Sequence, residues 1–94
     1  MQRHVWATER LWEALVVPSS KSWDEGAKAL SVSPFPPEVL ARGGVHARSA
    51  ATDFGKLTAR APAAKSTEER ARLYSELLLT CGVCHRALRE APAH

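Results

Sequence analysis

The chain reads LLLTCGVCH over residues 77–85, and the interpretation of the fold begins from this stretch. Its apolar positions belong to a stripe at three- and four-residue steps, made up of Leu73, Leu77, Cys81, Cys84 and Leu88. Such spacing predicts an amphipathic helix whose stripe faces a core. Both thiols therefore lie on the apolar face, which places them in the interior of a helical protein.

The order Cys-x-x-Cys-His is the spacing of covalent c-type haem attachment. Two thiols three residues apart on a helix share one face, so both can reach the vinyl groups on one porphyrin edge. The next residue, His85, stands beside the second thioether, and its imidazole is the expected proximal ligand of the iron. We therefore expect one haem c, attached through Cys81 and Cys84 and ligated by His85.

Two other interpretations of the cysteine pair are weaker. A structural zinc site needs four ligands, and here the second pair would have to be His4 and His46, which are far apart in the sequence. A thioredoxin-like dithiol lies beside a strand–helix–strand unit, whereas the residues before Cys81 have a helical period and composition. The sequence favours haem and leaves these two as alternatives.

The length and the charge of the chain restrict the size of its core and the kinds of partner that it can bind. The chain has 94 residues, which suits one small domain with a modest core unless a large apolar group fills it. Its two cysteines both belong to the motif, so no disulfide framework replaces a core. The net charge is +3, without runs of like charge. We therefore expect no nucleic-acid partner.

The periodicity of apolar residues predicts four helices, over residues of about 2–17, 22–32, 37–61 and 66–91. Pro18 ends the first helix, and a stiff connector that contains Pro34 and Pro36 follows the second. Four amphipathic helices with short links form an antiparallel four-helix bundle. We predict an all-α fold, a single domain over residues 1–94, with the covalently bound haem in its interior.

Local signals mark where two of these helices begin and where one is weak. Ser22 and Glu25 have the spacing of a capping box for the second helix. Ser66 and Glu69 have the same spacing for the fourth. The glycine pair at 43–44 weakens the third helix, by about 1 kcal/mol per glycine relative to alanine. Small residues there allow either a porphyrin face or a neighbouring helix to approach.

The second axial ligand has to come from upstream of the motif, because the nine residues after His85 contain no methionine. The upstream candidates are Met1, His4 and His46, while His94 ends a tail rich in alanine and proline. We favour His4 because it lies on the apolar stripe of the first helix. An iron without a sixth ligand, or one bound by Met1 or His46, is the alternative.

Three tryptophans occur in this short chain. Trp12 and Trp23 fall on the inward stripes of the first two helices, so we expect them in the core or against the haem. Trp6 lies off the main stripe, and we interpret it as a residue of a homodimer interface or of the haem edge.

A C-terminal helix that carries LLLTCGVCH, preceded by three further helices, resembles the class II c-type cytochromes, the cytochrome c prime and c-556 type. The resemblance implies a four-helix bundle with Cys81 and Cys84 as thioether donors and His85 as the proximal ligand. It also places the distal haem face against the first helix, which in this family supplies a methionine or an apolar side chain. This chain departs from both patterns with His4, and it is a short variant of the family pattern.

The motif and the resemblance together imply a mono-haem electron carrier and not an enzyme. With His4 and His85 on the iron, coordination barely changes between oxidation states, which suits one-electron exchange with redox partner proteins. The alternative is a five-coordinate haem, or one with a displaceable distal ligand, that binds a small gas such as NO or CO. We expect no titratable group other than His4 near the distal pocket, so peroxidase-like catalysis is not expected.

Haem attachment to this motif normally occurs outside the cytoplasm, so we expect a periplasmic or otherwise extracytoplasmic protein. The start of the chain, MQRH, has no apolar secretory core behind its charges, and no stretch approaches the length of a membrane span. We therefore expect either that a leader has been removed or that the chain is a domain of a longer exported protein.

Overall fold

The computed structural model of the chain describes residues 2–32 and 35–90 and contains four α-helices joined by short links. They are α1 (Gln2–Val16), α2 (Ser20–Ser31), α3 (Pro37–Arg60) and α4 (Thr67–Glu90), with a 3₁₀ turn, η1 (Ala61–Ala63), before α4. No strand is present in either described range, so the prediction of an all-α fold with four helices is confirmed.

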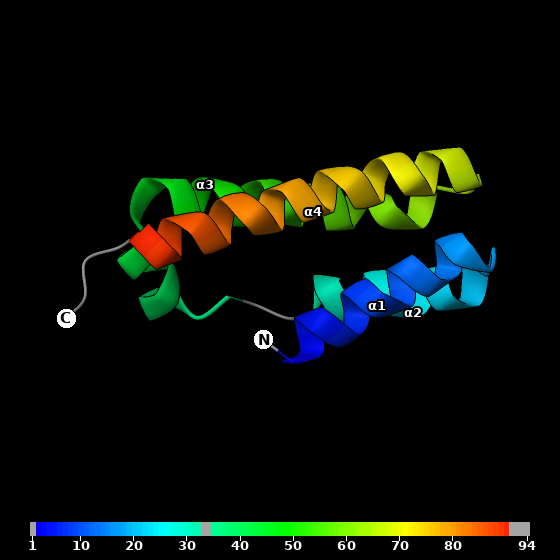
Figure 1. Cartoon of the computed structure of the whole chain (residues 1–94), viewed down its shortest axis with the longest axis horizontal. Helices are drawn as coiled ribbons and strands as arrows, with labels where there is room; N and C mark the ends of the chain where they lie inside the picture. The colour runs from blue at the N-terminus through cyan, green and yellow to red at the C-terminus, as the bar shows by residue number, and fades with distance from the viewer. Residues whose placement is uncertain (1, 33–34, 91–94) are drawn as a thin grey trace.

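The helices pair into two antiparallel hairpins that lie side by side (Figure 1). α1 and α2 have 15 and 12 residues, whereas α3 and α4 have 24 residues each. At the usual helical rise, α4 extends roughly 36 Å and the two short helices roughly 20 Å. α1 contacts α4 and α2 contacts α3. The long hairpin therefore continues past the short one at the end where α4 finishes (Figure 1).

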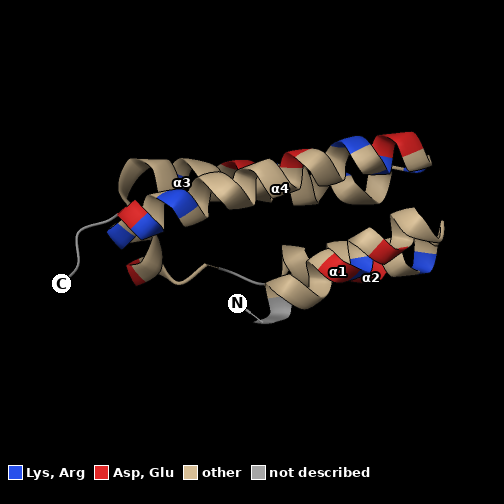
Figure 2. Ribbon diagram, viewed as in Figure 1, with Lys and Arg blue, Asp and Glu red and all other residues tan. Residues whose placement is uncertain are grey.

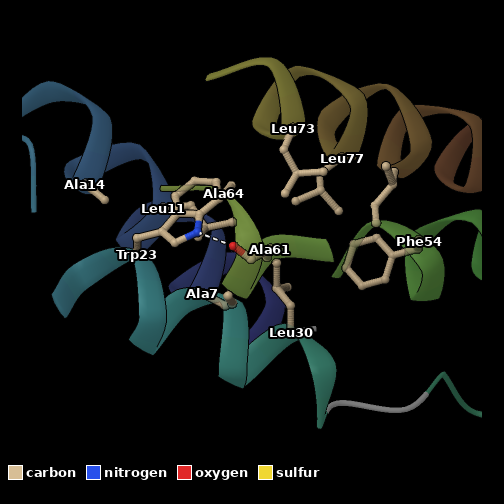
Figure 3. Packing of buried hydrophobic residues seen from close by; sticks show 12 residues of the cluster. Ala7, Leu11, Ala14, Trp23, Leu30, Phe54, Ala61, Ala64, Leu73 and Leu77 are labelled. Carbon is tan, nitrogen blue, oxygen red and sulfur yellow. Dashed lines mark hydrogen bonds between the residues drawn. The ribbon is translucent and has the colours of Figure 1, made fainter. Parts of the chain in front are cut away.

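The main hydrophobic core fills the end of the molecule where the α1–α2 turn and the α3–α4 link lie (Figure 1, Figure 3). Trp23 is fully buried there, and its indole N–H donates to the Ala61 carbonyl oxygen at 2.9 Å. Arg70 is 7% exposed, and its Nε donates to the Ala64 carbonyl oxygen at 2.8 Å. Its guanidinium carbon lies 5.6 Å from the Trp23 ring centroid. These four residues, the Trp23 clamp, fasten α2 to η1 and the start of α4.

The start of α4 has the predicted capping box, whereas the start of α2 does not. The Ser66 hydroxyl accepts from the Glu69 amide at 3.1 Å, and the Glu69 carboxylate accepts from the Ser66 amide at 3.3 Å. In α2 the cap is Ser19, whose hydroxyl accepts from the Ser22 amide at 3.2 Å. The helix therefore begins two residues earlier than predicted, and the box of Ser22 with Glu25 is wrong.

The two side chains of that expected box make a contact between helices instead. Arg10 of α1 donates to the Ser22 hydroxyl and to the Glu25 carboxylate, each at 3.0 Å. This ties together the two helices of the short hairpin. Elsewhere basic and acidic residues are interspersed along the helices (Figure 2). The spacing of Ser22 and Glu25 suits a cap, but Ser19 offers an earlier one and Arg10 occupies both side chains.

α3 is broken near its beginning at Gly44, which has φ 71° and ψ −155°. This backbone conformation is essentially restricted to glycine. The glycine pair therefore does more than weaken the helix, because it divides α3 into residues 37–43 and 45–60. A Cβ atom on Gly43 would clash with the Ala47 Cβ atom of α3 and would lie 3.1 Å from Leu88 Cδ2 of α4. Close packing within α3 and against α4 leaves no room for a side chain at Gly43, and the approach of a porphyrin face, the other predicted interpretation, stays a prediction.

Replacing Gly44 by alanine is expected to lower the free energy of unfolding by about 1–3 kcal/mol, because alanine is strained at this φ and ψ. Among the described residues, nothing beyond the adjacent backbone lies within 4 Å of the added Cβ, so the cost is conformational. Gly55 is the matched control, since it has the same open space but lies within the regular part of α3. Gly55→Ala should raise the free energy of unfolding by about 0.5–1 kcal/mol. Urea denaturation measures both, and equal effects would contradict the prediction.

Candidate functional site

A cavity of about 670 Å³ opens between the two hairpins, next to the main core. All four helices and the connector between α2 and α3 contribute to its walls. The walls are largely apolar and include Val5, Leu30, Val39, Phe54, Leu78 and Leu88. The volume lies within the range of about 300–1,000 Å³ that is usual for ligand and cofactor pockets.

The structure brings the four predicted haem-site residues to this one cavity. Cys81, Cys84 and His85 line it from α4, and His4 lines it from α1. The two helices belong to different hairpins, so the site exists only when the hairpins are together. Met1, an alternative distal ligand, lies outside the described residues.

α4 is a continuous helix through the motif, which places both thiols on its inner face. Cys81 is partly buried and packs against the main core. Cys84 is 6% exposed and forms a second, smaller cluster with Ala47 and Ala50 of α3. The motif therefore lies at the junction of the two clusters, and His85 follows as an exposed residue at the cavity wall.

The surroundings of the two thiols favour the protonated form. Burial raises the pKa of Cys84 above its ordinary value. Burial also raises the pKa of Cys81, with a further contribution from the neighbouring Cys84. Both cysteines are free thiols. Redox dithiols and nucleophilic cysteines need a lowered pKa, so the thioredoxin-like interpretation loses support.

The zinc interpretation required His4 and His46 as a second pair of ligands. His46 lies on an exposed position of α3 and does not line the cavity, so the structure separates these two histidines. Within residues 2–32 and 35–90, no group of three or more cysteine, histidine or acidic side chains is placed to hold a metal ion by itself. Because His46 does not line the cavity, its position also argues against it as the distal ligand of an iron held there.

His4 lies in the first turn of α1 and faces inward, as its position on the stripe predicts. Its ring centroid is 5.2 Å from that of Phe35, in an edge-on arrangement, and 5.9 Å from that of Phe54. The Thr8 hydroxyl donates to the His4 carbonyl oxygen at 2.7 Å. One and two turns farther along the same stripe, Thr8 lines the cavity and Leu11 is buried.

The tryptophans of α1 lie outside the core. Trp12 lines the cavity and is half-exposed, so the expectation of core burial holds for Trp23 alone. Packing of Trp12 against a haem stays a prediction. Trp6 is also half-exposed, with the guanidinium carbon of Arg10 6.0 Å from its ring centroid. Its assignment to a homodimer interface likewise stays a prediction.

Tyr74, Glu9 and Phe35 are among the residues of the cavity wall that sequence reasoning missed. Tyr74 lies seven residues before Cys81, two turns along the same face, so spacing could have identified it. Burial, followed by the interaction with Cys81, raises the pKa of Tyr74, so its hydroxyl keeps its proton. Glu9 also lines the cavity, so α1 brings a carboxylate there in addition to His4. Phe35 stands in the proline-rich connector, where no periodicity indicates a direction.

Over the described ranges, no helix combines the length and the apolar character needed to cross a membrane. Comparisons of the chain with protein-family models, curated proteins and solved structures find no match.

Proposed function

We propose that the protein is a mono-haem c-type cytochrome, similar to the class II proteins, that carries one electron at a time. One observation carries the proposal: the thiols of Cys81 and Cys84 and the imidazoles of His85 and His4 line the same cavity. Two thiols and two nitrogen ligands are what a doubly tethered, six-coordinate haem takes from its protein.

The cavity walls suit a porphyrin in size and polarity. Val5, Trp12 and Leu78 line the cavity and are nevertheless 53%, 53% and 44% exposed. A broad apolar group held in the cavity would remove these side chains from water, which stabilises the complex by about 25 cal/mol for each Å² covered. The position of these three residues therefore favours a large, flat, apolar ligand.

The residues of this chain would tether the group and complete its coordination. Cys81 and Cys84 would hold the haem through two thioethers, each S–H bond being replaced by an S–C bond with the hydrogen going to the neighbouring vinyl carbon, so that attachment would need no oxidant. His85, next to Cys84 on the helix, would supply a ring nitrogen as a ligand of the iron. When bound, the haem supplies a reversible one-electron change at iron.

His4 as the second ligand makes the site a carrier of electrons at low potential. Two imidazole nitrogens favour the ferric state more than a histidine–methionine pair does. The apolar walls of the cavity exclude water and limit rearrangement when the charge of the iron changes. The proposed partners are redox proteins, and the proposed location is the periplasm or another extracytoplasmic compartment, where such attachment normally occurs.

A second function, reversible binding of NO or CO, is favoured by the place of His4 in the chain. The first turn of a helix has backbone amides without intrahelical partners, so this part of α1 is held less firmly than its centre. A detached His4 would leave an open coordination position within apolar walls. Visible spectra of the reduced protein under CO separate the functions, because a firmly six-coordinate carrier keeps its spectrum whereas a gas-binding protein changes it.

Covalent attachment is tested on protein exported together with cytochrome c maturation factors. We expect a denatured mass spectrum that exceeds the bare polypeptide by one haem, and a pyridine haemochrome spectrum typical of two thioether links. Cys84→Ala should shift that spectrum toward a single link, because Cys81 remains. A wild-type mass equal to that of the polypeptide alone would reject the proposal.

A further inference from the structure

Three of the described residues that line the cavity carry a hydroxyl group: Thr8 of α1, and Tyr74 and Thr80 of α4. Both threonine hydroxyls are occupied, because each donates to the carbonyl oxygen four residues earlier in its own helix. Thr8 donates to His4 at 2.7 Å, and Thr80 donates to Glu76 at 2.8 Å. Over residues 2–32 and 35–90, no residue accepts a hydrogen bond from the Tyr74 hydroxyl. Tyr74 is therefore the hydroxyl of the described wall that can still donate to a bound molecule.

The surroundings of Tyr74 keep it a hydrogen-bond donor. Burial, and then the interaction with Cys81, raises its pKa, so the phenol retains its proton at neutral pH. The side chain is partly buried and packs against the main core, which holds the ring at the cavity wall. A haem in the cavity would take the place of water beside this donor, and a hydroxyl left without an acceptor is unfavourable. The bound group has to supply the acceptor itself.

A haem carries two strong acceptors, the carboxylates of its propionate groups, on the edge opposite to the vinyl groups. We propose that the Tyr74 hydroxyl donates a hydrogen bond to one of these carboxylates and so fixes the edge of the haem that the two cysteines do not hold. The inference rests on the proposed haem function. A hydrogen bond to an ionised acceptor is roughly twice as strong as one between neutral groups.

The position of Tyr74 along α4 suits this role. Tyr74 lies seven residues before Cys81, which places it about 10.5 Å away along the helix axis and on nearly the same face. α1 and α4 run in opposite directions, so later residues of α1 lie level with earlier residues of α4 (Figure 1). The cavity therefore extends from the thiols and His4 toward Tyr74 and Trp12, the direction in which the second edge of a tethered porphyrin can lie.

This part of the cavity also suits a charged group. Trp12 lines the cavity and is half-exposed, so the cavity reaches the surface there, and a carboxylate can keep part of its hydration. Glu9 of α1 brings a negative charge to the wall, but it is an exposed residue, so water and dissolved ions screen this charge from a propionate.

The first test is a binding cycle between Tyr74 and the carboxylates of the ligand. Haem and its dimethyl ester, in which both carboxylates are blocked, are titrated into the double variant Cys81→Ala, Cys84→Ala, with and without Tyr74→Phe. Without the thiols, binding is reversible and dissociation constants can be measured. We expect Tyr74→Phe to raise the dissociation constant of haem roughly tenfold to hundredfold, the factor for a hydrogen bond to a charged group, and that of the ester by no more than about twofold.

Ser75→Ala is the matched control, because it removes a hydroxyl from the neighbouring residue of α4, which is exposed and does not line the cavity. It should change neither dissociation constant. The second test uses the mature holoprotein, with the propionate carboxylates labelled by a heavy carbon isotope. We expect Tyr74→Phe to shift one labelled carboxylate band in the infrared spectrum and Ser75→Ala to shift none.

The outcomes separate this inference from the function on which it rests. Equal losses of affinity for haem and for the ester, or a carboxylate band that Tyr74→Phe leaves in place, would reject the role of Tyr74 and leave the cytochrome standing. A change confined to the stretching frequency of bound CO would show that the hydroxyl donates to a distal gas instead. If the double variant binds neither ligand, the band of the mature protein decides. A mature protein without haem would reject both proposals.

Discussion

His4→Ala should convert the ferric haem completely from low spin to high spin. His4 is the residue of α1 at the cavity wall that carries a nitrogen ligand, and alanine leaves the sixth position of the iron open. The reduction potential should rise, because the ferric state loses one strong donor. Electron paramagnetic resonance and visible absorption measure the spin state, and a redox titration measures the potential.

His46→Ala is the control for this substitution, since His46 is exposed on α3 and does not line the cavity. Its spectrum should equal that of the wild type. His4→Met should restore a low-spin haem at a higher potential, because thioether sulfur stabilises ferric iron less than imidazole does. If His4→Ala keeps an unchanged low-spin spectrum, another residue is the ligand.

Cys81→Ala combined with Cys84→Ala should remove the attached haem and lower the melting temperature by about 12–24 °C. Without the haem, Val5, Trp12 and Leu78 stay half-exposed, as they are in the structure. Covering the remaining surface of three such side chains contributes about 3 kcal/mol. In a domain of this size each kcal/mol corresponds to roughly 4–8 °C. Circular dichroism during heating measures the loss.

The control is the wild-type chain produced without maturation factors, which keeps both thiols but receives no thioether-linked haem. It should melt close to the double variant, because the lost stability comes from the haem and not from the sulfur atoms. A double variant that melts at the temperature of the mature wild type would show that the haem is not part of the folded core.

Periodicity was sufficient to predict which side chains of α4 face inward. Leu73, Leu77 and Cys84 are buried as the stripe requires, since one face of a packed helix meets a core at every third or fourth residue. The same argument predicts the inward direction of His4. Trp12 falls on an inward stripe as well but is 53% exposed, because it lines the cavity and not the core.

Features that depend on contacts between segments far apart in the sequence could not be predicted from local patterns. Arg10 donates hydrogen bonds to Ser22 and Glu25, the two side chains that were expected to cap α2. The antiparallel pairing of α1 with α2 brings Arg10 next to them. Phe35 reaches the cavity from a connector without a repeating pattern. The glycine pair at 43–44 indicates a weak point in the third helix. The direction in which α3 breaks at Gly44 depends on how the start of α3 packs against α4.

The Trp23 clamp lies at the end of the long hairpin where α3 passes into α4, so we expect resistance to unfolding to decrease from this end toward the end of α4 (Figure 1). Backbone amides around Trp23 should exchange their hydrogens with solvent only when the whole chain unfolds. Those of residues 37–43, separated from the rest of α3 by Gly44, should exchange through local opening. A group as broad as a porphyrin could then enter between the hairpins while the clamped end keeps its native contacts.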